Sequence, residues 1–278
     1  MSERVVLAGC GDLGMRVAQR LLKRGDEVFA LRRTVPQDDR AGIQWLRADL
    51  ADPASLGGLP GGVTQLAYLP APDRRDEATY RALFLDGLRH LLEALDSSLL
   101  RRVVFVSSSA VYGEHGDAWV DEGTAADPQG FNGRVLLQAE RWLQQQAPAV
   151  VLRLAGLYGP GRTQLLQRLR AGQASVPRTL PHWANRIHVD DAAAAVVHLL
   201  DLPDAQPLYL GVDDTPLPLD RLYDHLTGLL GVLPAKAGAA PAGVGSKRLS
   251  NARLRASGWA PRWPDAREGY AALLDAAG

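Results

Sequence analysis

A glycine-rich segment near the start of the chain has the residue types and the spacing of a nucleotide-phosphate site. It follows an apolar run at residues 5–8, typical of a strand buried on both faces, and it precedes apolar residues at helical spacing. In this context Gly9 permits a tight turn, Gly11 lets a pyrophosphate approach the backbone, and Gly14 lets the helix pack closely on the strand. The segment predicts a dinucleotide site, and it reads Gly9-Cys10-Gly11-Asp12-Leu13-Gly14.

The start of the helix after this turn completes the predicted phosphate site. Backbone amides at Asp12 and Leu13 would point at the phosphates, and the helix dipole would favour their negative charge. We interpret Cys10 as a small loop side chain rather than a nucleophile. The alternative is a glycine turn in an α/β protein that binds no dinucleotide.

The end of the next predicted strand bears on which dinucleotide binds. An NAD site places an acidic residue about 20 residues after the glycines, where it accepts hydrogen bonds from the ribose hydroxyls. Here the strand at residues 27–31 continues into Arg32 and Arg33 without a carboxylate. Because guanidinium groups suit a 2′-phosphate, the sequence predicts NADP as the cofactor, with NAD as the alternative. Two solvated surface arginines are the competing interpretation.

Three later segments carry hydroxyl, basic and acidic groups. In the first, an apolar strand at residues 103–106 delivers Ser107 and Ser108 to its carboxyl end, where open α/β sheets bind ligands. The segments read Ser107-Ser108-Ser109-Ala110-Val111-Tyr112-Gly113, Arg153-Leu154-Ala155-Gly156-Leu157-Tyr158-Gly159-Pro160-Gly161 and Asn185-Arg186-Ile187-His188-Val189-Asp190-Asp191. In order and approximate spacing they resemble the short-chain dehydrogenase/reductase superfamily, and more narrowly its extended branch of NAD-dependent epimerases and dehydratases.

This resemblance covers residues 4–230 approximately and implies a role for individual positions. It implies that Ser108 is the catalytic hydroxyl that hydrogen-bonds the substrate oxygen, and that the region of Arg186 and His188 faces the substrate. It implies cofactor contacts near the adenine at Asp49 and Leu50, along the ribose and pyrophosphate at Leu69, Pro70 and Ala71, beside the nicotinamide at Gly156 and Leu157, and at Ser107.

The chain departs from the family at the catalytic pair Tyr-x-x-x-Lys. In the family the Tyr transfers a proton, and the Lys lowers its pKa and holds the nicotinamide ribose. The matching segment here, residues 131–140, places Asn132 at the Tyr position and Leu136 at the Lys position. Asn is neither an acid nor a base near neutral pH. The candidate substitutes are Tyr112 or His188 as proton donor and Arg134 as the positive charge.

The elements that must position these residues alternate between strand and helix. Apolar strand-like runs are separated in several places by helical patterns, which predicts parallel strands joined by right-handed crossovers. We therefore expect an α/β fold, a Rossmann-type doubly wound parallel sheet with a small C-terminal substrate-side lobe. Residues 1–154 would form the dinucleotide-binding core, and residues 155–278 the remaining core elements plus the lobe, as one integrated unit. The runs are residues 5–8, 27–31, 43–46, 63–69, 103–106, 150–154 and 207–210.

Composition excludes several classes of protein. Lys plus Arg and Asp plus Glu both number 31, so there is no basic excess for a nucleic-acid partner. One cysteine and six scattered histidines predict no metal site. The apolar runs are too short to span a bilayer, and the start of the chain does not read as a signal peptide. We expect a cytoplasmic protein whose partner is a small-molecule substrate.

Two functions are compatible with these residues. The first is an NADP(H)-dependent oxidoreductase or epimerase that acts on a small carbonyl or sugar-like substrate. The second is a non-catalytic NADPH-binding redox sensor or regulatory module, which the missing Tyr and Lys favour. The resemblance also implies a homodimer that pairs the helices at residues 80–95 and 134–146, whose apolar residues include Leu88, Leu92, Val135 and Trp142. The alternative is that both helices use these residues against the sheet.

Overall fold

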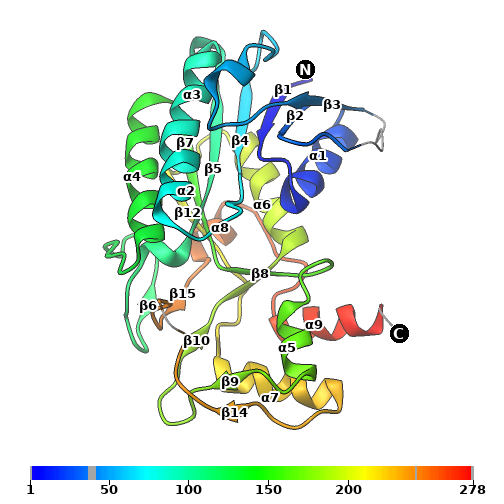
Figure 1. Cartoon of the computed structure of the whole chain (residues 1–278), viewed down its shortest axis with the longest axis vertical. Helices are drawn as coiled ribbons and strands as arrows, with labels where there is room; N and C mark the ends of the chain where they lie inside the picture. The colour runs from blue at the N-terminus through cyan, green and yellow to red at the C-terminus, as the bar shows by residue number, and fades with distance from the viewer. Residues whose placement is uncertain (1, 37–41, 242, 277–278) are drawn as a thin grey trace.

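A seven-stranded sheet, entirely parallel, runs through the middle of the molecule (Figure 1). The computed structural model describes residues 2–36, 42–241 and 243–276. In spatial order the strands are β3 (Ile43–Arg47), β2 (Glu27–Arg32), β1 (Arg4–Ala8), β4 (Gln65–Tyr68), β5 (Arg102–Ser108), β7 (Ala149–Leu154) and β12 (Leu208–Gly211). Each strand lies on one of the apolar runs, so the predicted doubly wound sheet is confirmed.

The strand order reverses between β1 and β4, and this reversal positions the site. Val5 of β1 pairs with Val28 of β2 on one side and with Gln65 of β4 on the other. The next strand along the chain after β1 is β2, on one side of this pair, whereas the next strand after β4 is β5, on the other side. A crevice opens outside the carboxyl ends of two strands whose connections diverge in this way.

Helices cover both faces of the sheet (Figure 1). On one face α1 (Asp12–Arg24) packs against α6 (Val189–Asp201). On the other, α2 (Glu77–Arg81), the π-helical segment η2 (Ala82–Asp86) and α3 (Gly87–Ala94) follow one another beside α4 (Phe131–Gln146). We expected one uninterrupted helix at residues 80–95, and the π segment is a departure from that prediction.

A smaller lobe lies below the carboxyl edge of the sheet in Figure 1. It has its own apolar core, which includes Tyr158, Leu166, Leu222 and Tyr270. Its helices are α5 (Gln164–Arg170), α7 (Leu219–Leu230) and α9 (Ala266–Asp275). The predicted small C-terminal lobe is confirmed. Its short strands are β8 (Gly156–Tyr158), β9 (Ser175–Val176), β10 (Trp183–Ala184), β11 (Arg186–His188), β13 (Leu217–Pro218) and β14 (Lys236–Ala237).

The remaining elements join the lobe to the core. Strand β6 (Trp119–Val120) pairs in parallel with β15 (Arg248–Leu249), and α8 (Ala252–Ala256) packs on β12. Strand β14 lies within the stretch 233–245 that we expected to be a loop, of which residue 242 lies outside the described residues. Across the described ranges, no helix is both long and apolar enough to cross a membrane.

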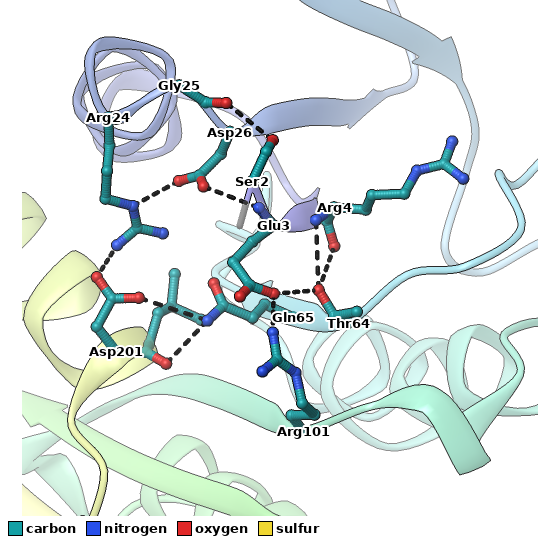
Figure 2. Close-up of polar contacts among 11 residues, drawn as sticks. Ser2, Glu3, Arg4, Arg24, Gly25, Asp26, Thr64, Gln65, Arg101 and Asp201 are labelled. Carbon is teal, nitrogen blue, oxygen red and sulfur yellow. Dashed lines mark hydrogen bonds and ion pairs between the residues drawn. The ribbon is translucent and has the colours of Figure 1, made fainter.

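Polar contacts close the opposite, amino-terminal edge of the sheet (Figure 2). Glu3 accepts hydrogen bonds from Arg101 and from the Thr64 hydroxyl, the latter at 2.6 Å. The Arg101 guanidinium holds the pKa of Glu3 below its ordinary value. Arg24 at the end of α1 pairs with Asp201 at the end of α6. These contacts tie both helix ends and three strands together at the edge away from the crevice.

Candidate functional site

The glycine-rich loop lies between β1 and α1, and each glycine meets a different constraint. Gly9 has a φ of +89°, and a Cβ there would lie 2.4 Å from the Cα of Pro70. A Cβ at Gly14 would lie 2.9 Å from the Leu69 side chain. A Cβ at Gly11 would meet no atom within 4 Å, although Gly11 lines the crevice. Gly9 and Gly14 are therefore fixed by the fold, whereas Gly11 leaves room for a ligand.

A cavity of about 970 Å³ opens at the strand-order reversal. This volume suits a large organic ligand. Every residue predicted to contact the cofactor lines it except Ser107 and Gly156. The residues brought together are Gly9, Gly11, Asp12, Leu13, Gly14, Arg32, Arg33, Asp49, Leu50, Leu69, Pro70, Ala71 and Leu157. The open glycine, the start of α1 and the cavity together fit a dinucleotide.

The two arginines after β2 differ in their surroundings. Arg32 lines the large cavity and also an adjoining one of about 440 Å³, which it shares with Gly11 and Arg16. Arg33 pairs with Asp73 at 2.6 Å, and both of these side chains are exposed. Arg32 is therefore the arginine whose guanidinium has no carboxylate within 4 Å among the residues described.

Charged side chains connect the glycine loop to the lobe. Asp12 accepts from Arg16 at 3.0 Å and from Arg162 at 2.8 Å, and Arg16 also pairs with Asp190 at 2.6 Å. Asp190 is at the start of α6. Cys10 is within this loop with its side chain buried, and burial raises the pKa of its thiol to about 12. A thiol held in its neutral form is a packing group rather than a nucleophile.

The two serines at the end of β5, Ser107 and Ser108, have different surroundings. Ser107 is buried, and its hydroxyl donates to Glu140 of α4. Glu140 in turn pairs with Arg153 of β7 at 2.6 Å, also buried. Ser107 therefore belongs to a structural network, and it does not line the cavity. Ser108 is half-buried, and its Oγ accepts from the amide of Ala110 at 3.2 Å, which starts the short turn after β5.

The three residues predicted to substitute for the Tyr and Lys of the family do not line the cavity. Tyr112 is buried, donates its hydroxyl to the Asp121 carbonyl at 3.0 Å, and has its pKa raised by burial. Arg134 is exposed and donates to the Gln129 carbonyl at 3.0 Å. His188 is buried, and its Nδ1 accepts from the amide of Asp190 at 3.2 Å, which caps α6. None of the three lines the cavity.

The pKa of His188 reflects the same placement. Burial lowers it, and the nearby Asp190 and Asp191 carboxylates oppose that effect. A neutral ring accepts at Nδ1, as the cap on α6 requires. The structure thus gives His188 a helix-capping role, and the predicted role as proton donor has no support from its position.

The positions of Asn132 and Leu136 follow from the start of α4. A Cβ at Gly133 would lie 2.3 Å from the Ala110 carbonyl oxygen, so this helix packs tightly on the turn after Ser108. Asn132 is half-buried beside that contact. Leu136, one turn later, is buried in the core. Asn132 therefore presents an amide near the turn after β5, and Leu136 contributes an apolar side chain to the core.

Several cavity residues were not identified from the sequence. Some are neighbours of predicted residues in the glycine loop and after β2, β3 and β4, and the others come from α2, η2, β5 and the loop between β8 and α5. No local motif marks the residues of α2 and η2, because the fold alone brings these helices beside the cavity. The residues are Cys10, Leu31, Thr34, Ala48, Ala51, Pro72, Asp73, Arg74, Ala78, Thr79, Ala82, Leu83, Val106 and Arg162. Among the residues with described positions, no group of three His, Cys, Asp or Glu side chains could hold a metal ion.

Residues 5–209 match the NAD-dependent epimerase/dehydratase family. The chain belongs to this family. The predicted family is therefore confirmed, and the family's cofactor is a nicotinamide dinucleotide, which the glycine loop and the cavity fit. The assignment of Asn132 and Leu136 to the places of the family's Tyr and Lys stays a prediction from the sequence.

The chain is also similar to individual proteins. The chain is 28% identical to the protein YeeZ of Escherichia coli K12 over 245 residues, which are 84% of this chain and 85% of YeeZ. A structure from Methylobacillus flagellatus, described as a candidate NAD-dependent epimerase/dehydratase, is 37% identical with a TM-score of 0.85, covering 100% of this chain and 99% of that one. MoeE5, solved with UDP-glucose and NAD, shares the fold at 22% identity and a TM-score of 0.82, covering 98% and 97%.

Proposed function

We propose that this protein binds NADP(H) in the cavity and that it is an oxidoreductase or epimerase acting on a small carbonyl or sugar-like substrate. The observation that carries the proposal is the glycine loop, in which Gly11 stays open while Gly9 and Gly14 are packed. MoeE5, which shares the fold, was solved with NAD bound. Arg32 supports the choice of NADP, because it reaches two adjoining cavities without a carboxylate partner within 4 Å in the described part of the chain.

The chain's own residues would divide the binding work. The backbone at Gly11 and the start of α1 would hold the pyrophosphate, and Arg32 would hold the 2′-phosphate. Asp49 and Leu50 line the part of the cavity beside β3, where the adenine would lie. When bound, the dinucleotide supplies or accepts a hydride at its nicotinamide. Ser108, at the end of β5, would hydrogen-bond the substrate oxygen.

The first test compares the two reduced dinucleotides. NADPH should bind more tightly than NADH, and the double variant Arg32→Ala, Arg33→Ala should lose about 1.5–3 kcal/mol of NADPH binding, roughly ten- to a hundredfold. Because Arg33 already pairs with Asp73, we expect Arg32→Ala alone to cause most of the loss. Fluorescence titration of both dinucleotides measures it, with Arg168→Ala, exposed on α5, as the control. A wild type without preference, or a double variant that keeps it, would contradict the choice of NADP.

A non-catalytic NADPH-binding module is the second candidate, and a specific observation favours it. Leu136, which the sequence predicts at the Lys position, is buried, and Tyr112, Arg134 and His188 all bond groups outside the cavity. NADPH-loaded protein mixed with small aldehydes, ketones and keto sugars distinguishes the two candidates. Loss of NADPH absorbance that Ser108→Ala reduces supports the enzyme. Tight NADPH binding without turnover on any of these compounds supports the module.

A further inference from the structure

Arg162 reaches the large cavity from a segment that is remote in the sequence from the glycine loop. It lies in the loop between β8 and α5, and it lines the cavity together with Gly11 and Asp12. Its Nε atom donates to Oδ2 of Asp12 at 2.8 Å, although 150 positions separate the two residues in the chain. This ion pair therefore connects the glycine loop with the loop before α5, beside the place proposed for the pyrophosphate.

The turn that carries Arg162 is fixed to two helices of the core. The amide of Arg162 donates to the Gly159 carbonyl at 2.9 Å, which closes the turn. A Cβ at Gly159 would lie 2.7 Å from the Val189 side chain, so the turn packs directly on the start of α6. Arg16 of α1 donates to the Pro160 carbonyl at 3.4 Å. The backbone that presents Arg162 is therefore held by both α1 and α6.

The carboxylate of Asp12 lies between two guanidinium groups. Its Oδ1 accepts from Arg16 at 3.0 Å, and its Oδ2 accepts from Arg162. Arg16 also pairs with Asp190 at 2.6 Å, so its charge is shared between two carboxylates. Among the residues described, Arg162 pairs with Asp12 alone. Arg162 is therefore the less compensated cation of the two, and it is the one that lines the large cavity.

Most of the hydrogen-bond donors of Arg162 are available to a ligand. A guanidinium has five N–H groups, and within the described part of the chain only the one on Nε of Arg162 has an acceptor. The side chain is 32% exposed, so the other donors are not enclosed by protein. Phosphate oxygens suit such a group, because a planar guanidinium offers them two parallel N–H donors. The structure thus presents an anchored cation with free donors in a cavity that fits a dinucleotide.

We propose that Arg162 binds the pyrophosphate of the dinucleotide and that Asp12 positions its guanidinium. The glycine loop and the start of α1 offer backbone amides to the pyrophosphate, and Arg162 adds a full positive charge from the loop before α5. This inference rests on the proposed function, because it requires a dinucleotide in the cavity. It does not depend on the choice between NADP and NAD, since both contain the pyrophosphate.

The test compares fragments of the dinucleotide that contain or lack the pyrophosphate. ADP-ribose contains the pyrophosphate and lacks both the nicotinamide and the 2′-phosphate. Adenosine 2′-monophosphate contains the 2′-phosphate and lacks the pyrophosphate. Both fragments and NADPH are titrated by calorimetry into the wild type, Arg162→Gln and Arg162→Lys, and urea unfolding checks that each variant is folded. Arg168→Gln, at an exposed position on α5, is the matched control.

We expect Arg162→Gln to weaken the binding of ADP-ribose and of NADPH by about tenfold or more, with Arg162→Lys between it and the wild type. The affinity for adenosine 2′-monophosphate should stay that of the wild type, and the control should bind all three compounds normally. Equal losses for both fragments would indicate a general disturbance of the cavity and would overturn the inference. Tighter binding of ADP-ribose would also overturn it, because the ion pair would then obstruct the cavity.

The outcome separates this inference from the proposed function. If the wild type binds NADPH and ADP-ribose, and Arg162→Gln binds both equally well, the inference fails and the proposed function stands. A wild type that binds neither compound would overturn both.

The positioning role of Asp12 has its own readout. With Arg162 present, Asp12→Asn should weaken the binding of ADP-ribose several-fold, because the guanidinium loses its charged anchor. In the Arg162→Gln background the same substitution should cause no further loss, since the group that Asp12 positions is already absent. Normal ADP-ribose binding in Asp12→Asn, or equal losses in the two backgrounds, would overturn the role of Asp12.

Discussion

At the scale of single residues, the glycine loop separates the constraints of folding from those of binding. Gly9 combines a positive φ with a 2.4 Å approach to the backbone of Pro70, so any side chain there must move the loop after β4. Gly11 has a φ of −82°, which any residue adopts, and no atom near its missing Cβ. The packing of the fold therefore leaves room for a side chain at Gly11, and this room opens to the cavity.

This difference predicts opposite effects for two alanine substitutions. Gly11→Ala should unfold within about 0.5 kcal/mol of the wild type, because its methyl group meets no protein atom. It should weaken NADPH binding by about tenfold or more, since the methyl group fills the space that a pyrophosphate needs. Gly9→Ala should cost more than about 1 kcal/mol of unfolding free energy. Urea unfolding and NADPH titration measure both variants. A Gly11→Ala protein with normal NADPH affinity would contradict our placement of the pyrophosphate.

The sequence predicted which glycines line the cavity, but it did not predict which way the candidate catalytic side chains point. The glycines carry their meaning in their spacing, and the cavity gathers them as predicted. Tyr112 gave no such signal, because the direction of its side chain depends on a partner on another strand. The Tyr112 ring lies over the Arg153 guanidinium at 4.8 Å, and Arg153 is on β7, far along the chain. Nothing in the segment around Tyr112 indicates that its hydroxyl is already bonded.

At the scale of elements, a buried ion pair joins α4 to the two strands beneath it. Glu140 of α4 accepts from Ser107 of β5 and from Arg153 of β7, and all three side chains are buried. In chain order β5 comes first, and α4 crosses over to β7, so the pair holds a crossover helix on the strands it connects. Ser108 is the neighbour of Ser107. The network therefore fixes the end of β5 from which Ser108 is presented.

We predict that Glu140→Gln will destabilise the protein by about 3–5 kcal/mol, because it leaves the Arg153 charge buried without a partner. Replacing both residues by methionine should cost much less, since the desolvation cost of both charges disappears together. Urea unfolding of the wild type, the single variant and the double variant measures the two effects. A single variant within about 1 kcal/mol of the wild type would contradict a tightly paired, buried Arg153.

A π-helical segment interrupts the helix at residues 77–94, and the spacing of the apolar residues did not predict it. The apolar residues at helical spacing predict one helix, and they do lie on the buried face. The π segment adds one residue to a turn, and the spacing of the apolar residues in the sequence does not reveal this addition. Two tertiary contacts lie at this segment: the Tyr68 hydroxyl donates to the Leu83 carbonyl, and Gly87 packs directly against Leu50. Leu83 and Leu50 both line the cavity, so the irregular turn shapes the binding site.

At the scale of the whole molecule, the sheet was predictable and the lobe was predictable only in outline. A continuous apolar run specifies a strand buried on both faces, and parallel connections allow few arrangements of such strands. The lobe's strands β8, β9, β10, β11, β13 and β14 have two or three residues each, too short to show any periodicity. The contact of Arg186 with Gly156 depends on one such pair of strands, and it could not be foreseen from either segment alone.

The expected homodimer is the last question at this scale, and the structure changes which residues it would use. Leu88, Leu92 and Val135 are buried against the protein's own core. Trp142 is half-buried, and the Arg89 guanidinium lies 5.6 Å from its ring centroid. Three of the four apolar residues behind the predicted dimer are therefore unavailable to a second copy. A dimer through α3 and α4 would have to use the outer residues, Arg89 and Trp142 among them.

Sedimentation velocity at micromolar concentration tests this dimer, and two kinds of variant separate folding from association. Leu88→Ala should lower the unfolding free energy by about 2–5 kcal/mol, as expected for a buried leucine, without changing the sedimentation coefficient. The variant Arg89→Glu, Trp142→Ala changes the outer surface, so it should convert a dimer formed there to a monomer. A wild type that sediments as a single monomeric species would rule out the dimer. A dimer that survives the surface substitutions would show that the two copies meet elsewhere. The remaining apolar residues of the predicted interface, Leu88, Leu92 and Val135, are buried in the protein's own core and cannot form it.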